Sequence, residues 1–405
     1  MKSRAVVVGA SLAGLRAAEG LRRSGFEGDL VVVGAETHFP YDRPPLSKQL
    51  LTGKTDAAGV QLDRSDDLGI EWWLGTRATA LDVVERRIQL APAGPGSPPG
   101  RPDDLSYDHL VIATGAAPRI LPSFEPAPGV HYLRTLDDSL QLREALLRAE
   151  KMIVIGAGFI GLEVASSASS LGVDVTVLET LPVPLSRAIG DEMGNAVADF
   201  HRRHGVTVMT GVSVEGIVGA GAFEGVKLAG GDVIPGQLVV VGVGVAPVTA
   251  WLEGSDVDLD NGVLCDKSLR VTRGGRPLPD VVAAGDVARW HHPAFGAPVR
   301  VEHWTNAVEQ GEAAAKSLLM PEAAPVFGPV PYFWSDQHGA KIQFVGDATG
   351  WDDIAVVDGS IEDDRFVVAY GRQGKLAAAL GMRRPAKVMA MQRLIEDGAG
   401  FPPPS

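Results

Sequence analysis

The sequence predicts an α/β protein with two Rossmann-like domains, followed by a C-terminal α+β domain. Twice, over residues 5–36 and 153–179, an apolar strand enters a glycine-rich turn, a helix of small residues follows, and a second strand ends on an acid. Prolines then cluster between residues 321 and 331, and residues 332–405 alternate as antiparallel strands do before a closing helix. The repeat predicts the two Rossmann-like units, and the alternation predicts the third domain.

The composition is that of a globular protein and excludes several classes of function. A chain of 405 residues has room for two or three domains. Its net charge of −13 argues against nucleic acid or an anionic membrane as the main partner. The single cysteine, Cys265, excludes a disulfide framework, a thiolate metal cluster and an internal redox dithiol. We find no signal-peptide pattern and no apolar run of the ~18 residues that a membrane span needs, and we expect a cytoplasmic protein.

The second glycine motif, within residues 153–179, is the complete one. Gly156 makes the tight turn, Gly158 lets the backbone approach a pyrophosphate, and Gly161 lets the helix pack on the strand. The helix N-terminus that follows favours negative charge. Glu179 lies 18 residues after the last glycine (179 − 161), close to the spacing of a ribose-binding carboxylate, which is about 20 residues. This stretch therefore predicts a dinucleotide site.

The first motif, residues 5–36, is a copy with one departure. Ser11 replaces the middle glycine between Gly9 and Gly14, and the second strand reaches Glu36. Serine is small enough to allow close approach, and its hydroxyl is suited to holding a phosphate. Where two such units share one chain, the first usually holds a flavin dinucleotide and the second a nicotinamide one. For Glu36 the alternative is a solvated acid at a strand end.

Three further stretches are suited to bringing a ligand against the chain. The prolines of residues 39–48 keep Arg43 and Lys48 on a stiff loop. A strand ends on Thr114-Gly115, and another ends on Asp286, which alternatively caps a helix. Helices are expected over residues 136–150, 305–319 and 385–397, and the tail from residue 401 is expected to fray.

Together, several motifs resemble a known family. They are the two glycine motifs, Arg-Pro-Pro-Leu-Ser-Lys (43–48), Ala-Thr-Gly (113–115), Ala-Gly-Asp (284–286), His-Trp (303–304) and Phe-Trp-Ser-Asp-Gln (333–337). The chain resembles the FAD-dependent, NADH-oxidising ferredoxin reductases of bacterial haem-thiolate monooxygenases and Rieske-type dioxygenases. The resemblance implies a glutathione-reductase-like fold: an FAD domain (1–117 and 247–320), an NAD domain (118–246) and a C-terminal domain (321–405) over the flavin.

The resemblance also implies which residues bind the two cofactors. The residues expected at FAD are Gly9, Ser11, Leu12, Ala13, Gly14, Glu36, Arg43, Lys48, Ala78, Thr114, Gly115, Arg119, Asp286 and Trp304. Those expected at NADH are Gly156, Gly158, Phe159, Ile160, Gly161, Glu179, Arg187 and Gly244. Glu179 favours NADH over NADPH, because a carboxylate accepts bonds from both ribose hydroxyls and repels a 2′-phosphate. No cation follows it until Arg187.

Lys48 and Glu163 are the residues that the resemblance places in catalysis. Lys48 is expected to approach flavin N5 from its loop, and Glu163 lies two residues after Gly161, in the first turns of the helix. An ion pair across N5 would position the hydride acceptor and stabilise the reduced flavin. The alternative for Glu163 is a carboxylate that stabilises its own helix N-terminus, an effect of only about 0.3–1 kcal/mol.

The electrons are expected to leave the protein, because Cys265 is far from the position of a flavin-facing sulfur. The predicted acceptor is a [2Fe–2S] ferredoxin. Such ferredoxins are acidic, so docking needs a basic face, and residues 371–395 carry cations without any acid. The docking candidates are Arg372, Lys375, Arg383, Arg384 and Lys387. The alternative is an ordinary solvated face. Trp334 is expected to lie between flavin and docked cluster, or else in a core.

Two other functions stay open from the sequence. One is an NADH oxidase or peroxidase, although the family form of that chemistry uses a cysteine that is absent here. The other is a redox-responsive binding protein like apoptosis-inducing factor. The pair His291-His292 has no partner at ligand spacing, so no metal site is predicted. No sequence patch indicates an interface between copies, and a monomer is slightly favoured.

Overall fold

The computed structural model describes residues 2–219 and 223–403, and these residues form two compact units. The first unit comprises residues up to Asp42, Gln61–Ala117 and Ala246–Pro329. The second comprises Arg43–Val60, Pro118–Val245 and the described residues from Val330 onward. Short strands β8 (Ala116–Pro118) and β17 (Val245–Pro247) lie where the chain passes from one unit to the other.

The first unit is built on a nine-stranded sheet. Its strands are β1 (Arg4–Val8), β2 (Asp29–Val33), β3 (Ile70–Trp73), β7 (His109–Ile112), β18 (Val263–Cys265), β19 (Arg270–Arg273), β20 (Arg276–Ala283), β21 (Ala288–His292) and β22 (Ala297–Val299), in the order β22-β21-β18-β19-β20-β7-β1-β2-β3. The strands β20, β7, β1, β2 and β3 run parallel to one another, and β19 pairs with β20 in the antiparallel direction. β1 and β2 are valine-rich and almost wholly buried, as strands covered on both faces are.

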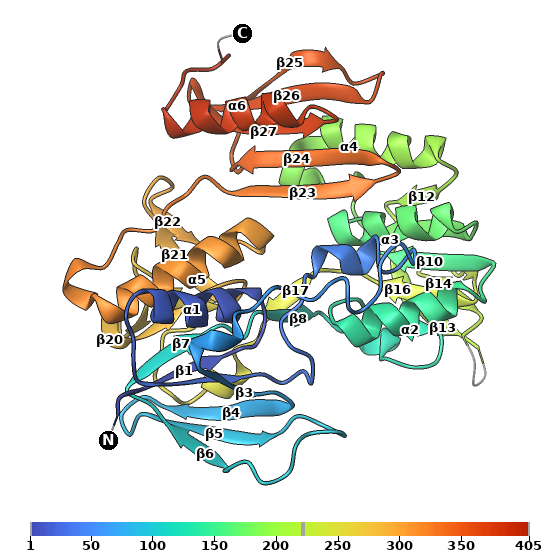
Figure 1. Ribbon diagram of the computed structural model, residues 1–405. Helices are drawn as coiled ribbons and strands as arrows, with labels where there is room; N and C mark the ends of the chain where they lie inside the picture. The colour runs from blue at the N-terminus through green and yellow to red at the C-terminus, as the bar shows by residue number, and fades with distance from the viewer. Residues whose placement is uncertain (1, 220–222, 404–405) are drawn as a thin grey trace. The chain divides into compact units, whose positions relative to one another are not determined.

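Helices α1 (Leu12–Arg23) and α5 (Trp304–Leu319) lie against each other beside this sheet (Figure 1). Glycine permits the close contact: a Cβ at Gly311 would come within 2.6 Å of the Ala13 carbonyl oxygen. The unit is completed by an antiparallel sheet of β4 (Thr76–Asp82), β5 (Arg87–Pro92) and β6 (Asp104–Ser106), and by 3₁₀ turns η2 (Asp66–Leu68), η4 (Ala250–Leu252) and η5 (Pro321–Ala323).

The second unit contains the other Rossmann-like sheet, whose five strands are parallel. They are β9 (Val130–His131), β10 (Lys151–Ile155), β11 (Asp174–Glu179), β12 (Thr207–Thr210) and β16 (Leu238–Val241), in the order β12-β11-β10-β16-β9. The helices are α2 (Leu136–Leu146), α3 (Phe159–Ser170) and α4 (Ser186–Arg203). Strands β13 (Val214–Val218), β14 (Gly225–Leu228) and β15 (Val233–Pro235) form a small antiparallel sheet, and η1 (Pro44–Ser47) and η3 (Pro122–Phe124) are 3₁₀ turns.

The C-terminal sheet belongs to the same unit. It consists of β23 (Tyr332–Gln337), β24 (Ala340–Gly346), β25 (Asp353–Ser360), β26 (Arg365–Arg372) and β27 (Lys375–Met382), in the antiparallel order β23-β24-β27-β26-β25. Helix α6 (Pro385–Glu396) packs on one face through Val388 and Met391. The other face shares a hydrophobic core with α3 and α4, where the Tyr370 hydroxyl donates to the Ile189 carbonyl at 2.8 Å.

The predicted fold class is confirmed, with two Rossmann-like sheets and an antiparallel C-terminal sheet. The described residues separate into two compact units, with residues 43–60 in the second. The predicted division into an FAD domain, an NAD domain and a C-terminal domain stays a prediction. The expectation of a frayed tail is wrong for Phe401, whose N–H donates to the Gly374 carbonyl at 2.9 Å and whose ring covers Gly371. Residues 404–405 of that tail lie outside the described residues. Across the described ranges, no helix has the length and apolar character of a membrane span.

Candidate functional site

The first glycine turn, in the first unit, is as compact as its sequence predicts. Gly9 has φ +124°, and a Cβ there would lie 2.0 Å from the Ala113 carbonyl oxygen at the end of β7. A Cβ at Gly14 would lie 1.8 Å from the Gly9 carbonyl oxygen. Ser11 is the N-cap residue of α1. The turn thus packs β1, β7 and the start of α1 together, and only glycine fits at its two ends.

Other residues expected at FAD lie around the carboxyl ends of the first unit's parallel strands. Glu36 follows β2 and accepts a hydrogen bond from the Tyr41 hydroxyl. Thr114 and Gly115 follow β7, where the Thr114 hydroxyl donates to the Val248 carbonyl at 2.8 Å. Asp286 follows β20. In open parallel sheets ligands bind at the carboxyl ends of strands, so this placement fits a nucleotide.

The structure rules out the helix-cap alternative for Asp286 and adds detail on other residues expected at FAD. Asp286 precedes β21, so it caps no helix. The Ala78 side chain is buried in the core, which leaves its backbone to face a ligand. The Trp304 indole donates to the Asp42 carboxylate at 2.6 Å. Three residues expected at FAD belong to the second unit: Arg43, Lys48 and Arg119. Of these, Arg43 donates to the Arg134 carbonyl and Arg119 to the Val245 carbonyl.

In the second glycine turn, the fold requires glycine at two positions, whereas the third glycine faces open space. Gly156 has φ +98°, and a Cβ at Gly161 would lie 2.2 Å from the Gly156 carbonyl oxygen. A Cβ at Gly158, by contrast, would meet no atom of the described chain within 4 Å. Gly158 is the N-cap of α3, and no side chain of the described residues caps this helix. An open helix N-terminus beside a bare glycine fits a pyrophosphate.

Glu179 lies at the end of β11, and both of its carboxylate oxygens accept backbone hydrogen bonds. Oε2 accepts from the Ala157 N–H and Oε1 from the Leu181 N–H, each at 2.8 Å. These bonds orient the carboxylate beside the glycine turn and leave further lone pairs for ribose hydroxyls. Arg187, near the start of α4, is exposed.

The other residues expected at NADH differ in what they offer. The Phe159 ring packs on Phe333 with ring centroids 4.7 Å apart, so its backbone rather than its side chain faces the turn. The Ile160 side chain is 48% exposed. Gly244 has φ +96° and open space where a Cβ would lie.

The predicted pair of Lys48 and Glu163 is formed and buried. The Lys48 ammonium lies 2.7 Å from Glu163 Oε2, with side chains only 10% and 7% exposed. The Ser47 hydroxyl donates to the same oxygen at 2.5 Å. Glu163 therefore does more than stabilise its own helix, because it binds a cation from a segment more than a hundred residues earlier in the chain. A buried pair of this kind needs good geometry and further hydrogen bonds to offset desolvation.

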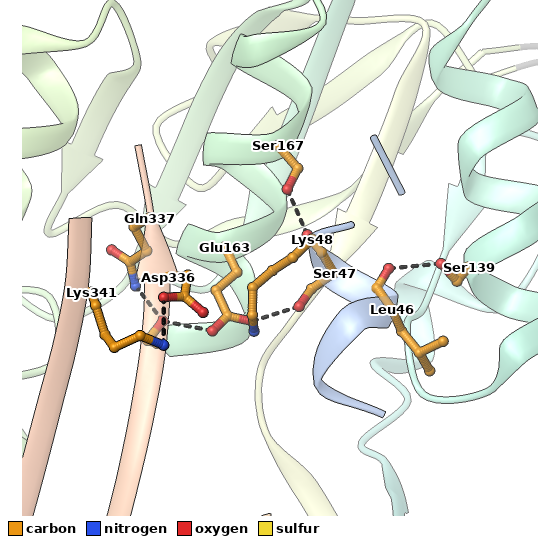
Figure 2. A network of polar contacts seen from close by, with 10 residues as sticks. Leu46, Ser47, Lys48, Ser139, Glu163, Ser167, Asp336, Gln337 and Lys341 are labelled. Atoms are coloured by element: carbon orange, nitrogen blue, oxygen red, sulfur yellow. Dashed lines mark hydrogen bonds and ion pairs between the residues drawn. The ribbon is translucent and has the colours of Figure 1, made fainter. Parts of the chain in front are cut away.

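Serines hold the loop that carries Lys48 against two helices (Figure 2). The Ser167 hydroxyl of α3 donates to the Ser47 carbonyl at 2.6 Å, and the Ser139 hydroxyl of α2 donates to the Leu46 carbonyl at 2.7 Å. The prolines at 44 and 45 give a 3₁₀ turn here instead of a longer helix. Lys48 is thus presented by a short, fixed element.

A chain of polar side chains continues from the other oxygen of Glu163. The Ser335 hydroxyl donates to Oε1 at 2.6 Å, and the Gln337 amide donates to Ser335 Oγ at 2.9 Å. His201 Nε2 then contacts Gln337 Oε1 at 2.8 Å, and His338 Nε2 contacts His201 Nδ1 at 3.1 Å. Ser335, Gln337 and His201 are completely buried. Figure 2 shows the inner part of this network, from Lys48 to Gln337.

His201 and His338, the two histidines of this hydrogen-bonded series, are neutral at physiological pH. Burial lowers the pKa of His201 to about 4. Burial, together with the neighbouring His201 and His204, lowers the pKa of His338 to about 3. The His204 ring stacks on His338 with centroids 4.4 Å apart. Desolvation disfavours the charged imidazolium, and a second positive charge nearby would add repulsion.

The sequence predicts Lys48 and Glu163 but not Ser335, Gln337 and His201. A sequence signal for Ser335 and Gln337 does exist. In β23 they alternate with Trp334 and Asp336, so two polar side chains face the buried side of a strand. Trp334 lies on the opposite face, where the Lys341 ammonium is 5.6 Å from its ring. Nothing local in the sequence indicates His201, because only the packing of α4 on β23 buries it.

The basic segment expected to dock a ferredoxin is divided between the two ends of β27. Arg372 and Lys375 lie at its start, and Arg383 and Arg384 directly follow its end. Acids neutralise part of the charge: Arg372 pairs with Asp347 at 3.3 Å, while Asp358 lies 2.7 Å from Arg384 and 3.9 Å from Lys387. The segment is therefore not one continuous basic patch.

Cys265 is buried in the hydrophobic core of the first unit, and burial raises the pKa of its thiol. A thiol of this kind is inert. Because it is the chain's single cysteine, sulfur takes no part in an electron relay here.

Comparisons with known proteins agree with this geometry. A family model described as pyridine nucleotide-disulphide oxidoreductase matches residues 3–311, and one described as reductase C-terminal matches residues 332–405. The chain is 35% identical over 395 residues to rhodocoxin reductase of Rhodococcus erythropolis, covering 96% of this chain and 88% of that protein. It is 33% identical over 402 residues to putidaredoxin reductase of Pseudomonas putida, covering 97% and 91%.

Solved structures give the same result. The ferredoxin reductase of the CYP199A2 system from Rhodopseudomonas palustris has a TM-score of 0.89 and 31% identity, with 98% of this chain and 96% of that chain covered. The reductase in a covalent putidaredoxin reductase–putidaredoxin complex has a TM-score of 0.90 and 32% identity, with 98% and 93% covered.

The chain therefore belongs to the pyridine nucleotide-disulphide oxidoreductase family, whose members use FAD and NAD(P)H. Within that family it is a ferredoxin reductase of bacterial oxygenase systems, and the enzyme class predicted from the sequence is confirmed. The residues present fit both nucleotides, since the compact turn at Gly9 and the open space at Gly158 are what two pyrophosphates need.

Substituting Gly158 with alanine should weaken NADH binding without affecting the fold. The new methyl group meets no atom of the described chain, but it projects into the space that a pyrophosphate would use. We expect the KM for NADH to rise by about tenfold or more, a loss of about 1.4 kcal/mol. The melting temperature should not change.

The matched control is Gly161→Ala, three residues further on. Its methyl group would collide with the Gly156 carbonyl oxygen, so we expect a melting temperature several degrees lower. Steady-state kinetics and differential scanning calorimetry separate the two effects. An unchanged KM in Gly158→Ala would show that the pyrophosphate does not approach this glycine.

Proposed function

We propose that this chain takes a hydride from NADH onto FAD and passes the electrons one at a time to a [2Fe–2S] ferredoxin. The observation that carries the proposal is the buried ion pair of Lys48 and Glu163, which joins a loop typical of the family to the helix of the second glycine motif. The ferredoxin would serve a cytochrome monooxygenase or a Rieske dioxygenase. Both kinds of system appear in the names of similar proteins, such as the ferredoxin reductase of the CYP199A2 system and the p-cumate 2,3-dioxygenase system reductase component.

FAD, when bound, supplies the step from two-electron to one-electron transfer. In the first unit, the residues that would hold it are Gly9, Ser11, Leu12, Ala13, Gly14, Glu36, Ala78, Thr114, Gly115, Asp286 and Trp304. In the second unit, Arg43, Lys48 and Arg119 would contribute. The compact turn at Gly9 and the strand-end position of Glu36 support this assignment.

Lys48 and Glu163 would act together at the atom that accepts the hydride. The ammonium offers a fixed positive charge where negative charge develops during transfer. The carboxylate holds the ammonium in place, since Glu163 Oε2 lies 2.7 Å from it, and Ser47 and Ser335 hold the carboxylate in turn. Because both side chains are almost completely buried, water screens this interaction little.

NADH rather than NADPH is the proposed donor. The Glu179 carboxylate is fixed by two backbone N–H groups, so it stays where a ribose would lie. It forms no ion pair with a cation of the described residues that would cancel its charge. A 2′-phosphate at this position would meet an uncompensated negative charge.

The proposed route for electrons to the ferredoxin passes Trp334. Lys341 lies over the Trp334 ring, and the Arg383 N–H donates to the Lys341 carbonyl at 2.9 Å. The end of β27 that carries Arg383 is therefore closer along the sheet to Trp334 than the end that carries Lys375, while the Arg383 guanidinium itself lies 5.9 Å from the Phe200 ring of α4. This proximity favours Arg383 and Arg384, rather than Arg372 and Lys375, as the docking residues for an acidic ferredoxin.

Reversing the charges of Arg383 and Arg384 to glutamate should raise the KM for ferredoxin by about tenfold and flatten its dependence on salt. The matched control reverses Arg372 and Lys375 at the other end of β27, about 25 Å away for a strand of this length. Steady-state assays over a range of ionic strength measure both variants. If neither variant changes the KM, docking does not use this segment.

The function as a whole is tested by NADH-driven cytochrome c reduction with a panel of [2Fe–2S] ferredoxins. We expect fast reduction with at least one acidic ferredoxin and very slow reduction without one. Rapid NADH consumption in air that needs no ferredoxin would indicate an oxidase instead. Slow turnover with every ferredoxin, together with a long-lived complex with NADH, would indicate a redox-responsive binding protein.

A further inference from the structure

The hydrogen bonds between Glu163 and His338 all run in one direction. Glu163 is a carboxylate paired with an ammonium, so the Ser335 hydroxyl must donate to it. The Ser335 oxygen then accepts from the Gln337 amide nitrogen, and Gln337 turns its oxygen toward His201. An amide oxygen only accepts, so His201 must carry its proton on Nε2.

The tautomers of both histidines follow from this order. Because burial keeps His201 neutral, its Nδ1 carries no proton and accepts, and His338 must donate from Nε2. Every donor between the surface and Glu163 therefore points its positive end toward the carboxylate. Aligned hydrogen bonds polarise one another, and the low dielectric of a buried site strengthens them.

The outer end of the chain is held in an unusual conformation. His338 lies in the tight turn between β23 and β24 with φ +46°, a left-handed value that glycine and asparagine adopt more readily. Its N–H donates to the Ser166 hydroxyl of α3 at 2.7 Å, and its ring lies between His201 and His204. These contacts fix the imidazole where it reaches His201.

We propose that His201 is a positioning residue that orients Glu163 for hydride transfer through Gln337 and Ser335, and that His338 serves to hold His201 in the Nε2-protonated tautomer. The chain of bonds fixes the rotamer and the charge of Glu163, and Glu163 fixes the Lys48 ammonium. The chain does not pass protons outward, because the Gln337 amide nitrogen would have to give up a proton that it holds at any physiological pH. This inference rests on the proposed function, in which Lys48 and Glu163 act at the hydride acceptor.

Two polar substitutions of His201 test the inference. In His201→Gln the amide nitrogen takes the place of Nε2 and keeps the bond to Gln337, whereas in His201→Asn the amide takes the place of Nδ1 and keeps only the bond to His338. We expect His201→Asn to lower the rate constant of flavin reduction at saturating NADH by about tenfold, with the Kd for NADH unchanged. His201→Gln should stay within about twofold of the wild type. Equal rates in both variants would overturn the proposal.

A measurement that does not depend on activity tests the direction of the hydrogen bonds between His338 and Glu163. We expect ¹⁵N NMR of the histidine-labelled protein at pH 7 to show both His201 and His338 as neutral, Nε2-protonated tautomers. An Nδ1-protonated or charged His201 would overturn the one-way chain. The two levels of failure are distinguishable: if Lys48→Met also leaves flavin reduction unchanged, the proposed function fails, but if only the His201 variants are unaffected, the inference alone fails.

Discussion

Replacing Lys48 with methionine should slow flavin reduction by NADH about a hundredfold, as removal of one preorganised charge-stabilising group does in other enzymes. Methionine has nearly the length of lysine but carries no charge. The ammonium lies 2.7 Å from Glu163, and no second cation of the described residues pairs with this carboxylate. Stopped-flow under anaerobic conditions measures the rate, normalised to bound flavin.

A control is needed because Lys48→Met also leaves a buried carboxylate without its cation. Breaking a buried pair in this way destabilises by about 3–5 kcal/mol, and a misfolded protein would also be slow. The variant Lys54→Met changes an exposed lysine six residues later in the chain and should behave as the wild type. Lys48→Met that binds FAD normally and reduces it at the wild-type rate would remove Lys48 from the reaction.

Replacing Glu179 with glutamine should reduce the preference for NADH over NADPH by about a hundredfold. Two unit charges about 4 Å apart repel by about 4 kcal/mol at an effective dielectric of about 20, and solvent lowers this to a few kcal/mol at an open ribose site. Glutamine removes the charge but keeps one oxygen for the backbone N–H groups of Ala157 and Leu181. The kcat/KM for each nucleotide measures the change.

The matched control is Asp174→Asn, which removes an exposed charge at the opposite end of β11. It should change neither kcat/KM value. If the wild type itself uses NADH and NADPH with comparable kcat/KM, Glu179 does not select the donor.

The glycine motifs and their strands were predictable because local chemistry determines them. Gly9 and Gly156 adopt positive φ in tight turns, and Gly14 and Gly161 have no room for a methyl group, so the sequence pattern and the structure describe the same constraint. The antiparallel C-terminal sheet was predictable from alternation, and the pair of Lys48 and Glu163 from resemblance.

The rest of the site depends on contacts between distant segments. His201 comes next to Gln337 because α4 packs on the C-terminal sheet, and no pattern within α4 reveals a polar partner for a buried histidine. The basic segment does not form one patch for a related reason: a strand separates its two ends, and Asp358 of β25 neutralises part of the charge of Arg384 and Lys387. Phe401 stays ordered because its ring fills the space above Gly371.

The most direct test of the account is the coupling between Lys48 and Glu163 in the rate constant of flavin reduction by NADH. We would compare Lys48→Met, Glu163→Gln and the double variant with the wild type. If the pair acts as a unit, the double variant should be about as slow as either single variant, a coupling of about 2–3 kcal/mol for a hundredfold loss. Losses that simply multiply, or no loss at all, would contradict the claim that this buried pair works at the hydride acceptor.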